Sequence, residues 1–258
     1  MSTFLSATII TSNEANNIER CLNSLIGVAD EIIVVDSIST DGTVDICRRY
    51  GCKVTERVFA GYGSQRQYAV GLANGRYVLS VDADEMLSQE LRENIIRLKN
   101  EGFTHRMYSF RVVNYICGRP MRRSGMNPDV QTRLFDRRYA NWDLLDVGER
   151  LSYPRGVQPA LIAGDMLHYR CNDFDELDFK ELRNAEMRGR VLAAAGIDAP
   201  APMSWLRAAS AYVKCQLREG AILDGTVGMR IARARFLATL AAYRTARRIS
   251  REGGGNRR

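Results

Sequence analysis

The chain has little of what several protein classes depend on. Of its 258 residues only two are histidine and six are cysteine, and the cysteines form neither a Cys-x-x-Cys pair nor a zinc-finger spacing. We therefore expect free thiols in a reducing compartment. No apolar run approaches the roughly 18 residues of a membrane-spanning helix, and the N-terminal residues lack the basic region of a secretory signal. These absences favour a cytoplasmic protein with at most a peripheral membrane contact.

Two familiar phosphate-binding loops are also absent. No Gly-x-Gly-x-x-Gly pattern follows the first predicted strand, and no Gly-Lys-Ser/Thr loop is present. Neither a dinucleotide-dependent oxidoreductase nor a P-loop NTPase is therefore supported. A nucleotide bound by this chain would need another anchor for its phosphates, such as a metal ion or an arginine.

The positive charge is concentrated in the C-terminal part. The chain has a net charge of +7, but from Met203 onward twelve Arg or Lys stand against three acidic residues, which gives +9 there and −2 before it. This asymmetry indicates an anionic partner, either a membrane surface or a nucleic acid. Bases normally stack on exposed aromatic rings, and aromatics are few and widely spaced in this part, so a nucleic acid is not expected.

The first hundred residues alternate between strand-like and helix-like patterns. Runs of β-branched and aromatic residues predict strands, and apolar residues at helical spacing predict helices. Ser12 or Asn13 is the expected N-cap of the first helix. This βαβαβ order predicts an α/β fold with a mostly parallel sheet and right-handed crossovers. The predicted strands cover residues 4–10, 31–35, 53–58 and 77–81, and the predicted helices cover 14–26 and 43–50.

The stretch Tyr77–Glu85 changes abruptly from a strand-like run to a turn rich in carboxylates. Ligands of open α/β sheets bind beyond the carboxyl ends of the strands, and Asp36 ends a neighbouring predicted strand. Asp84, with Asp82 beside it, is therefore well placed to hold a hard divalent cation and, through it, a diphosphate. The alternative is a solvated acidic turn before a helix capped by Ser88.

Four arginines are candidates for binding anions. Arg66 follows Gly61-Tyr-Gly63 and is either a cation near the nucleotide or an ordinary surface residue of a helix. Arg119, Arg123 and Arg133 form a basic group suited to an anionic acceptor. The alternative for these three is a set of solvated arginines.

Short motifs follow one another in a recognisable order along the chain. The first set is Thr11-Ser-Asn-Glu14, Val34-Val-Asp-Ser37, Thr40-Asp-Gly-Thr43, Gln65-Arg66 and Leu79-Ser-Val-Asp-Ala-Asp-Glu85. With these motifs the chain resembles family 2 glycosyltransferases of the GT-A fold. It resembles more narrowly the branch that adds glucose to the inner core of bacterial lipopolysaccharide, through Gly118-Arg119, Ser124-Gly125, Pro128-Asp129, Arg133-Leu-Phe135, Glu149-Arg-Leu151, His168-Tyr169, Asp224-Gly225 and Gly228.

The resemblance implies roles for single residues. Thr11 and Asp36 match positions that contact the uracil and ribose of a UDP-sugar, and Asn13 and Glu14 belong to the same nucleotide-sugar-binding set. Asp82 matches the ribose-side aspartate and is also a candidate metal ligand, whereas Asp84 matches the ligand of a divalent metal ion, Mg²⁺ or Mn²⁺. His168 is a candidate third metal ligand, although a lone histidine is more often a structural hydrogen-bonding residue.

An inverting sugar transfer needs a base that removes the proton of the acceptor hydroxyl. The candidates are the carboxylates of Asp143, Asp146 and Glu149. The family pattern here is usually Val-His-Glu, whereas this chain has Val147-Gly-Glu149, so the glutamate is retained and the histidine is missing. Glu149 is therefore the expected base. The departure leaves open what the imidazole contributes, such as orientation of the base or a hydrogen bond to a phosphate.

The chain is expected to divide into a GT-A catalytic domain and a helical extension. Residues 1–195 form the catalytic domain, with a nucleotide-sugar half over about 1–100 and an acceptor half over about 101–195. Gly196, Pro200 and Pro202 predict a linker over 196–202. Residues 203–252 form the basic extension, with helices over 205–217 and 226–249, and residues 253–258 form a disordered tail.

The extension has two interpretations. Its helices pack on the catalytic domain with a solvated basic side, or they rest on an anionic membrane surface. The second interpretation draws on Phe236, Leu237 and Leu240, which lie among the arginines of the last predicted helix.

The predicted function is a metal-dependent, inverting glycosyltransferase that uses a UDP-sugar at the cytoplasmic face of the membrane. Glucose is the favoured sugar, and the favoured acceptor is lipid-linked, the lipopolysaccharide inner core. The alternative within this class is a polyprenyl-phosphate or other surface-polysaccharide glycosyltransferase. The alternative of another class is a non-catalytic module that binds nucleotides or nucleic acids.

Overall fold

The computed structural model describes residues 4–121, 123–125, 129–145, 148–197 and 200–255. The contacts of the chain divide it into two compact units. The first comprises Met1–Val113 and Asp129–Tyr169, and the second comprises Asn114–Pro128 and Arg170–Arg258. This division differs from the predicted boundary at residue 196, because the helix after residue 170 groups with the C-terminal helices.

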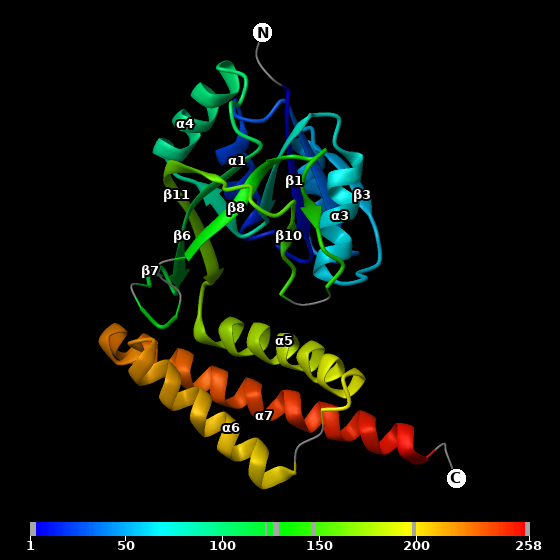
Figure 1. The fold of residues 1–258 in the computed structure, drawn as a ribbon, viewed down its shortest axis with the longest axis vertical. Helices are drawn as coiled ribbons and strands as arrows, with labels where there is room; N and C mark the ends of the chain where they lie inside the picture. The colour runs from blue at the N-terminus through cyan, green and yellow to red at the C-terminus, as the bar shows by residue number, and fades with distance from the viewer. Residues whose placement is uncertain (1–3, 122, 126–128, 146–147, 198–199, 256–258) are drawn as a thin grey trace. The chain divides into compact units, whose positions relative to one another are not determined.

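The N-terminal part of the first unit is the predicted alternation of strands and helices (Figure 1). Its four strands are parallel and lie in the order β3-β2-β1-β4. The strands are β1 (Leu5–Thr11), β2 (Glu31–Asp36), β3 (Lys53–Glu56) and β4 (Tyr77–Asp82), and the helices are α1 (Ile18–Leu25), α2 (Thr43–Arg49) and α3 (Tyr62–Leu72).

The sheet continues beyond β4 with antiparallel pairs. The order after β4 is β8-β6-β11-β5, and the short β7 pairs with β6. The parallel half therefore carries the first acidic strand ends, and the antiparallel half brings later segments beside them. The bounds are β5 (Glu85–Leu87), β6 (Met107–Ile116), β7 (Arg119–Pro120), β8 (Asp129–Asp136) and β11 (Ala160–Cys171), with a separate hairpin of β9 (Asn141–Trp142) and β10 (Leu151–Ser152) and helix α4 (Gln89–Asn100).

Apolar side chains cover both faces of the central strands, which is why these strands read as continuous apolar runs. On β4, Leu79 belongs to a core cluster with residues of α1 and α4, whereas the next residue back, Val78, belongs to a cluster with α3. This alternation is the two-residue period of a strand. The helices thus lie on both sides of the sheet and hold its strand ends in place.

Of the two predicted helix N-caps, that of α4 is confirmed and that of α1 is wrong. Ser88 caps α4 as expected, since its side chain accepts a hydrogen bond from the amide of Leu91. The first helix begins at Ile18 rather than at residue 14, and its N-cap is Asn17. Asn13 instead has a φ of 55°, in the left-handed region that asparagine tolerates better than most residues.

The second unit contains three long helices that lie side by side in Figure 1. Small residues allow two of them to approach closely, since Ala185 and Gly189 of α5 are buried together with Ala238 and Ala242 of α7. The elements are α5 (Phe174–Ala194), α6 (Ala201–Val213), the π-helical turn η1 (Lys214–Arg218), the 3-10 turn η2 (Ala221–Asp224) and α7 (Gly225–Gly255).

Two details of this unit correct the sequence prediction. Pro202 lies in the first turn of α6 instead of ending a helix, a position that proline tolerates because a backbone N–H there would have no acceptor within the helix. Helix α7 continues to Gly255, so the predicted disordered tail is helical over residues 253–255. Residues 256–258 and part of the predicted linker, residues 198–199, lie outside the described residues.

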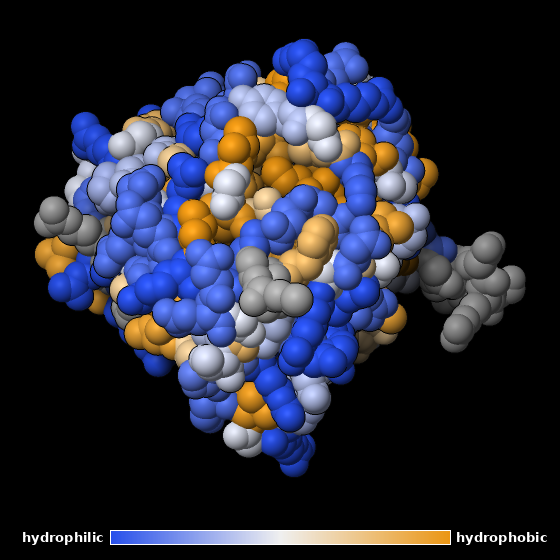
Figure 2. All heavy atoms as spheres, turned by 90° about the horizontal axis from the view of Figure 1, so that it is seen from above, coloured by the Kyte–Doolittle hydropathy of each residue, from blue (hydrophilic) through white to orange (hydrophobic). Residues whose placement is uncertain are grey.

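All six cysteines are free thiols, as predicted. Among the described residues, no helix combines the length and the apolar character that crossing a membrane requires. Figure 2 shows one face of the molecule, on which hydrophilic side chains surround smaller hydrophobic areas.

Candidate active site

The ends of three neighbouring strands form the floor of the candidate site. In the sheet register Thr11 of β1 pairs with Asp36 of β2, and the residue before Thr11 pairs with Asp82 of β4. The convergence of acidic strand ends that the sequence predicted is therefore confirmed. Thr11 is buried, and within the described chain its hydroxyl has no hydrogen-bond partner.

Asp36 organises the two loops that follow β1 and β2. Its carboxylate is fully buried and accepts hydrogen bonds from Ser39, at 2.7 Å from the amide and 2.5 Å from the hydroxyl. The Ser39 hydroxyl oxygen accepts from the amide of Asn13, whose side-chain oxygen accepts from the amide of Thr40. Asp36 and Asn13 thus fix the loop backbone. Glu14 also links the two loops, because its backbone amide donates to the Thr43 hydroxyl, while its carboxylate accepts from Asn17.

Helix α3 directs two adjacent side chains toward these strand ends. Gln65 is buried and donates from its amide to the hydroxyl oxygen of Ser37. Arg66 is 5% exposed, and its Nη2 lies 2.7 Å from a carboxylate oxygen of Asp82 while its Nε lies 2.9 Å from Glu149. The alternative that Arg66 is a surface residue is therefore wrong.

Asp82 is held by two guanidinium groups. The first is Arg66, described above. The second is Arg133 of β8, whose Nη2 lies 3.4 Å from the Asp82 carboxylate. Burial alone would raise the pKa of Asp82, but Arg66 and then Arg133 bring it well below its usual range. Asp82 is therefore ionised, and its carboxylate is paired with Arg66 and Arg133.

Arg133 is not part of a solvated basic patch. It is 7% exposed, donates to Gln131 at 2.8 Å and reaches Glu85 at 3.5 Å. Its Nη1 is buried and has no partner among the described residues. The predicted acceptor-binding group is thus divided, since Arg133 lies in the first unit whereas Arg119 and Arg123 are exposed in the second.

Glu85 is a structural member of the site that the sequence interpretation did not assign. It is 1% exposed, and its Oε2 accepts a hydrogen bond of 2.8 Å from the backbone amide of Asp82. Burial is the main reason that the pKa of Glu85 is raised. Its position as the third carboxylate of the Asp-x-Asp-Glu run was the available signal. Cys21 of α1 supports the same turn, because its thiol donates to the carbonyl of Asp82.

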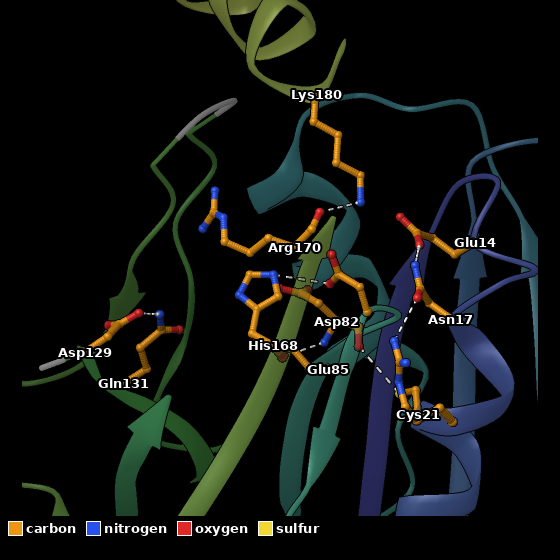
Figure 3. A network of polar contacts seen from close by, with 12 residues as sticks. Glu14, Asn17, Cys21, Asp82, Glu85, Asp129, Gln131, His168, Arg170 and Lys180 are labelled. Atoms are coloured by element: carbon orange, nitrogen blue, oxygen red, sulfur yellow. Dashed lines mark hydrogen bonds and ion pairs between the residues drawn. The ribbon is translucent and has the colours of Figure 1, made fainter. Parts of the chain in front are cut away.

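The register of β5 with β11 brings His168 to the Asp-x-Asp turn. His168 pairs with Glu85, and the amide of Tyr169 donates to the carbonyl of Asp84 at 2.8 Å. The Nε2 of His168 then lies 3.4 Å from a carboxylate oxygen of Asp84. Figure 3 shows His168 beside Asp82 and Glu85. Arg20 stacks on the ring of Tyr169 at 3.7 Å, which fixes this end of β11.

A loop after the β9 strand carries the base candidates. Glu149 is 15% exposed on its side chain and is paired with Arg66. Asp143 is half-buried, and its Oδ1 accepts from the amides of Leu145 and Arg150. Asp146 lies outside the described residues. Of the two described candidates, Glu149 is the one in contact with the strand-end cluster.

Residues 6–158 match the family model described as Glycosyl transferase family 2. The chain belongs to glycosyl transferase family 2. The resemblance inferred from the short motifs is therefore confirmed at the level of the family, and so are the enzyme class and the α/β fold with C-terminal helices.

Curated relatives carry related names. An uncharacterized glycosyltransferase of Rickettsia bellii is 37% identical over 144 residues, which cover 54% of this chain and 48% of that protein. The chain thus spans about half the length of the first of these relatives. A lipopolysaccharide core biosynthesis glycosyltransferase, LpsC of Rhizobium meliloti, is 29% identical over 191 residues, which cover 71% of this chain and 70% of that protein.

Solved structures of low similarity also match. TarS of S. aureus, residues 1–349 in complex with UDP, is 16% identical with a TM-score of 0.48, and the match covers 97% of this chain and 92% of that one. Glucosyl-3-phosphoglycerate synthase of Mycobacterium tuberculosis, in complex with Mn²⁺, UDP and glucosyl-3-phosphoglycerate, is 21% identical with a TM-score of 0.37, and the match covers 44% of each chain.

The donor set of this family 2 chain fits a divalent cation with two protein ligands. Asp84 offers a carboxylate oxygen and His168 an imidazole nitrogen, and both atoms face each other. The other expected ligand, Asp82, is paired with arginine instead, and the part of the chain that the structure describes contains no group of three or more His, Cys, Asp or Glu arranged to hold a metal. A cation bound here would take its remaining ligands from phosphate oxygens and water, as Mg²⁺ often does.

Proposed function

We propose that this chain is an inverting glycosyltransferase that transfers a hexose, with glucose favoured, from a UDP-sugar to a lipid-linked acceptor. The proposed acceptor is the inner core of lipopolysaccharide, and the proposed place is the cytoplasmic face of the membrane, where the C-terminal helices contact an anionic surface. The match to LpsC over about two thirds of each chain supports a role in lipopolysaccharide core synthesis.

One observation carries the proposal: a single edge of the sheet holds a carboxylate–imidazole pair and, next to it, a guanidinium that contacts both Asp82 and Glu149. A UDP-sugar needs compensation of the diphosphate charge on one side and a base on the other. Asp84 and His168 would hold a Mg²⁺ or Mn²⁺ ion, which when bound supplies charge neutralisation for the leaving diphosphate.

The residues of the chain then have separate tasks. Thr11, Asp36 and the loop that Asn13 and Asp36 fix would receive the uridine, and the unpartnered Nη1 of Arg133 supplies a buried donor for an anionic oxygen. The carboxylate of Glu149 would accept the proton of the acceptor hydroxyl. Arg66 orients this carboxylate through its Nε hydrogen bond.

The experiment is a donor and acceptor panel. The purified chain is incubated with several UDP-hexoses, with truncated inner-core lipopolysaccharide or a polyprenyl phosphate as acceptor, and with Mn²⁺, Mg²⁺ or a chelator, and UDP release is followed. We expect release that requires both the metal and the inner-core acceptor. Release with polyprenyl phosphate alone would favour the alternative acceptor. Binding of UDP without turnover of any donor would favour a non-catalytic module.

A further inference from the structure

On helix α6 small side chains are buried, whereas large apolar side chains face solvent. Its buried side consists of small residues, and Ser204, Ala208 and Cys215 are each at most 1% exposed. Its exposed side carries large apolar residues, since Leu206 is 65%, Val213 52% and Leu217 71% exposed when η1 is counted with the helix. A surface helix normally presents polar residues to solvent and apolar residues to the core.

The exposed apolar residues form a row. Leu206, Val213 and Leu217 are separated by seven and four residues, so they recur on one side of the helix after about two turns and one turn. The next segment, η2, continues the pattern with Ile222 and Leu223, which are 59% and 72% exposed. Large exposed apolar side chains that recur on one side of a helix mark an interaction site more often than scattered single residues do.

A basic row runs beside the apolar row. Arg207, Lys214 and Arg218 are all exposed and follow Leu206, Val213 and Leu217 by one residue each, so they have the same spacing on the adjoining side. The segment from Ala201 to Arg218 contains no acidic residue, and the acid that follows it, Glu219, lies 3.6 Å from Lys214 Nζ, whose side chain is 57% exposed. The face therefore combines large apolar side chains with a flank of positive charge.

The last helix offers less of such a surface than its sequence indicated. Leu240 is only 5% exposed, and Phe236 is half-buried with its ring 5.5 Å from the ring of Trp205. These residues of α7 are used for packing within the helical unit. Leu237, the third apolar residue named from the sequence of this helix, is 36% exposed, whereas the more exposed apolar side chains of α6 and η2 form a larger surface for a partner.

We propose that the row Leu206, Val213 and Leu217, together with η2, inserts into the interfacial region of a bilayer that contains anionic lipids. The charge of the flank selects this occupant, because Arg207, Lys214 and Arg218 would meet headgroup phosphates while the apolar row enters the acyl boundary. The inference rests on the proposed function for the presence of a membrane, but its test requires no donor, acceptor or metal.

The test measures binding of the full chain to vesicles by flotation. Vesicles contain either phosphatidylcholine alone or phosphatidylcholine with phosphatidylglycerol. We expect binding to the anionic vesicles at least tenfold stronger than to the neutral ones, and weaker binding as salt rises. The double variant Leu206→Gln with Leu217→Gln removes apolar surface without changing charge, and we expect at least a tenfold loss of binding.

A matched control is available in the first unit, where Leu161 and Val58 are 72% and 75% exposed. The double variant Leu161→Gln with Val58→Gln should bind anionic vesicles within twofold of the unchanged chain. Circular dichroism of each variant reports whether it is folded, and since all four side chains are solvent-exposed we expect unchanged spectra.

Three outcomes would overturn the proposal. The unchanged chain could bind neutral and anionic vesicles equally or not at all, or both double variants could lose binding to the same extent. The third outcome is a dimer, which light scattering without vesicles would detect and which the double variant Leu206→Gln with Leu217→Gln would dissociate. The apolar face would then be covered by a second copy of the chain. A UDP-release assay with a soluble donor and acceptor is independent of all three, so failure of the proposed function is scored separately.

Discussion

Arg66 donates from its Nε to Glu149 at 2.9 Å, and the same guanidinium reaches Asp82 at 2.7 Å through Nη2. The expected base and the expected donor-side aspartate are therefore joined through one side chain of α3. Burial would lower the pKa of Arg66, but Asp82 and then Glu149 keep it above the ordinary value for arginine, so the group stays charged. Arg66 accordingly positions Glu149 relative to the strand ends.

Replacing Glu149 by glutamine separates binding from transfer. The amide can still accept a hydrogen bond from Arg66 but cannot accept the proton of the acceptor hydroxyl, so we expect kcat to fall by about 10²-fold or more. Affinity for UDP should change by less than about threefold. The matched control is Asp143→Asn, because the amide oxygen can still accept from the Leu145 and Arg150 amides. If Asp143→Asn loses transfer and Glu149→Gln does not, the base assignment moves to Asp143.

Removing the Asp84 carboxylate should abolish the metal dependence of UDP binding. In Asp84→Ala the imidazole of His168 remains as a single protein ligand, which leaves the diphosphate charge uncompensated. Calorimetry with UDP in the presence and absence of Mn²⁺ measures the effect. Asp45→Ala, which removes an aspartate side chain that is 75% exposed, is the control and should retain the dependence. A metal-dependent affinity that is unchanged in Asp84→Ala would exclude Asp84 as a ligand.

Gly63 supports the loop that carries the base. A Cβ at this position would lie 2.1 Å from the backbone oxygen of Asp143 and 2.9 Å from that of Leu145, so Gly63→Ala must displace the loop. We expect transfer to fall more than tenfold. The control is Gly71→Ala on the same helix, where a Cβ meets no atom within 4 Å and alanine should stabilise the helix by roughly 0.5–1 kcal/mol. Steady-state kinetics and thermal unfolding of both variants distinguish the outcomes, and equal activity of the two would show that the loop adapts.

The local pattern of the chain was sufficient for most elements of the nucleotide half. Alternating strand and helix signals, the Ser88 cap and the acidic end of β4 are all short-range features and are found where the sequence placed them, although α1 begins at Ile18 rather than at residue 14, and α3 and β5 were not predicted. The partners of these residues were not predictable in the same way. Arg66 and Glu149 are 83 residues apart in the sequence, and nothing near Arg66 indicates which later carboxylate it meets.

Two further arrangements depend on contacts between distant segments. His168 comes close to Asp84 through the register of β11 with β5, strands that are not consecutive, and a shift by one residue would turn the imidazole to the other face. The grouping of α5 with α7 depends on close packing of small residues, which carry little hydrophobic signal in a sequence. Hydrophobic periodicity therefore identified the helices without showing which of them pack together.

Acid should weaken folding through Glu31. This side chain is 6% exposed and accepts hydrogen bonds from Lys53, Ser6 and Asn74. Burial alone would raise its pKa, but these partners, Lys53 first, lower the pKa of Glu31 to about 2. The stabilisation, on the order of 3 kcal/mol, is thus present above about pH 4.5 and is lost as pH falls toward 2. Urea unfolding of the native chain and of Glu31→Gln should differ most at neutral pH and converge in acid; a constant difference would contradict the assignment.

The packing of α5 on α7 gives a test of the helical unit. Gly189 is buried, and a Cβ there would lie 2.6 Å from Cβ of Thr245 and 2.7 Å from the backbone oxygen of Ala242. The second of these is backbone, which cannot rotate away, so Gly189→Ala should force the helices apart and cost about 1–3 kcal/mol despite the better helix propensity of alanine.

Arg190→Ala, at the exposed neighbouring position, should leave stability within about 0.5 kcal/mol. Chemical unfolding followed by circular dichroism measures both. Because Gly189 belongs to the second unit and the residues proposed to bind UDP belong to the first, UDP affinity of Gly189→Ala should be unchanged under native conditions. An equally stable Gly189→Ala variant would mean that α5 and α7 can separate without loss of packing.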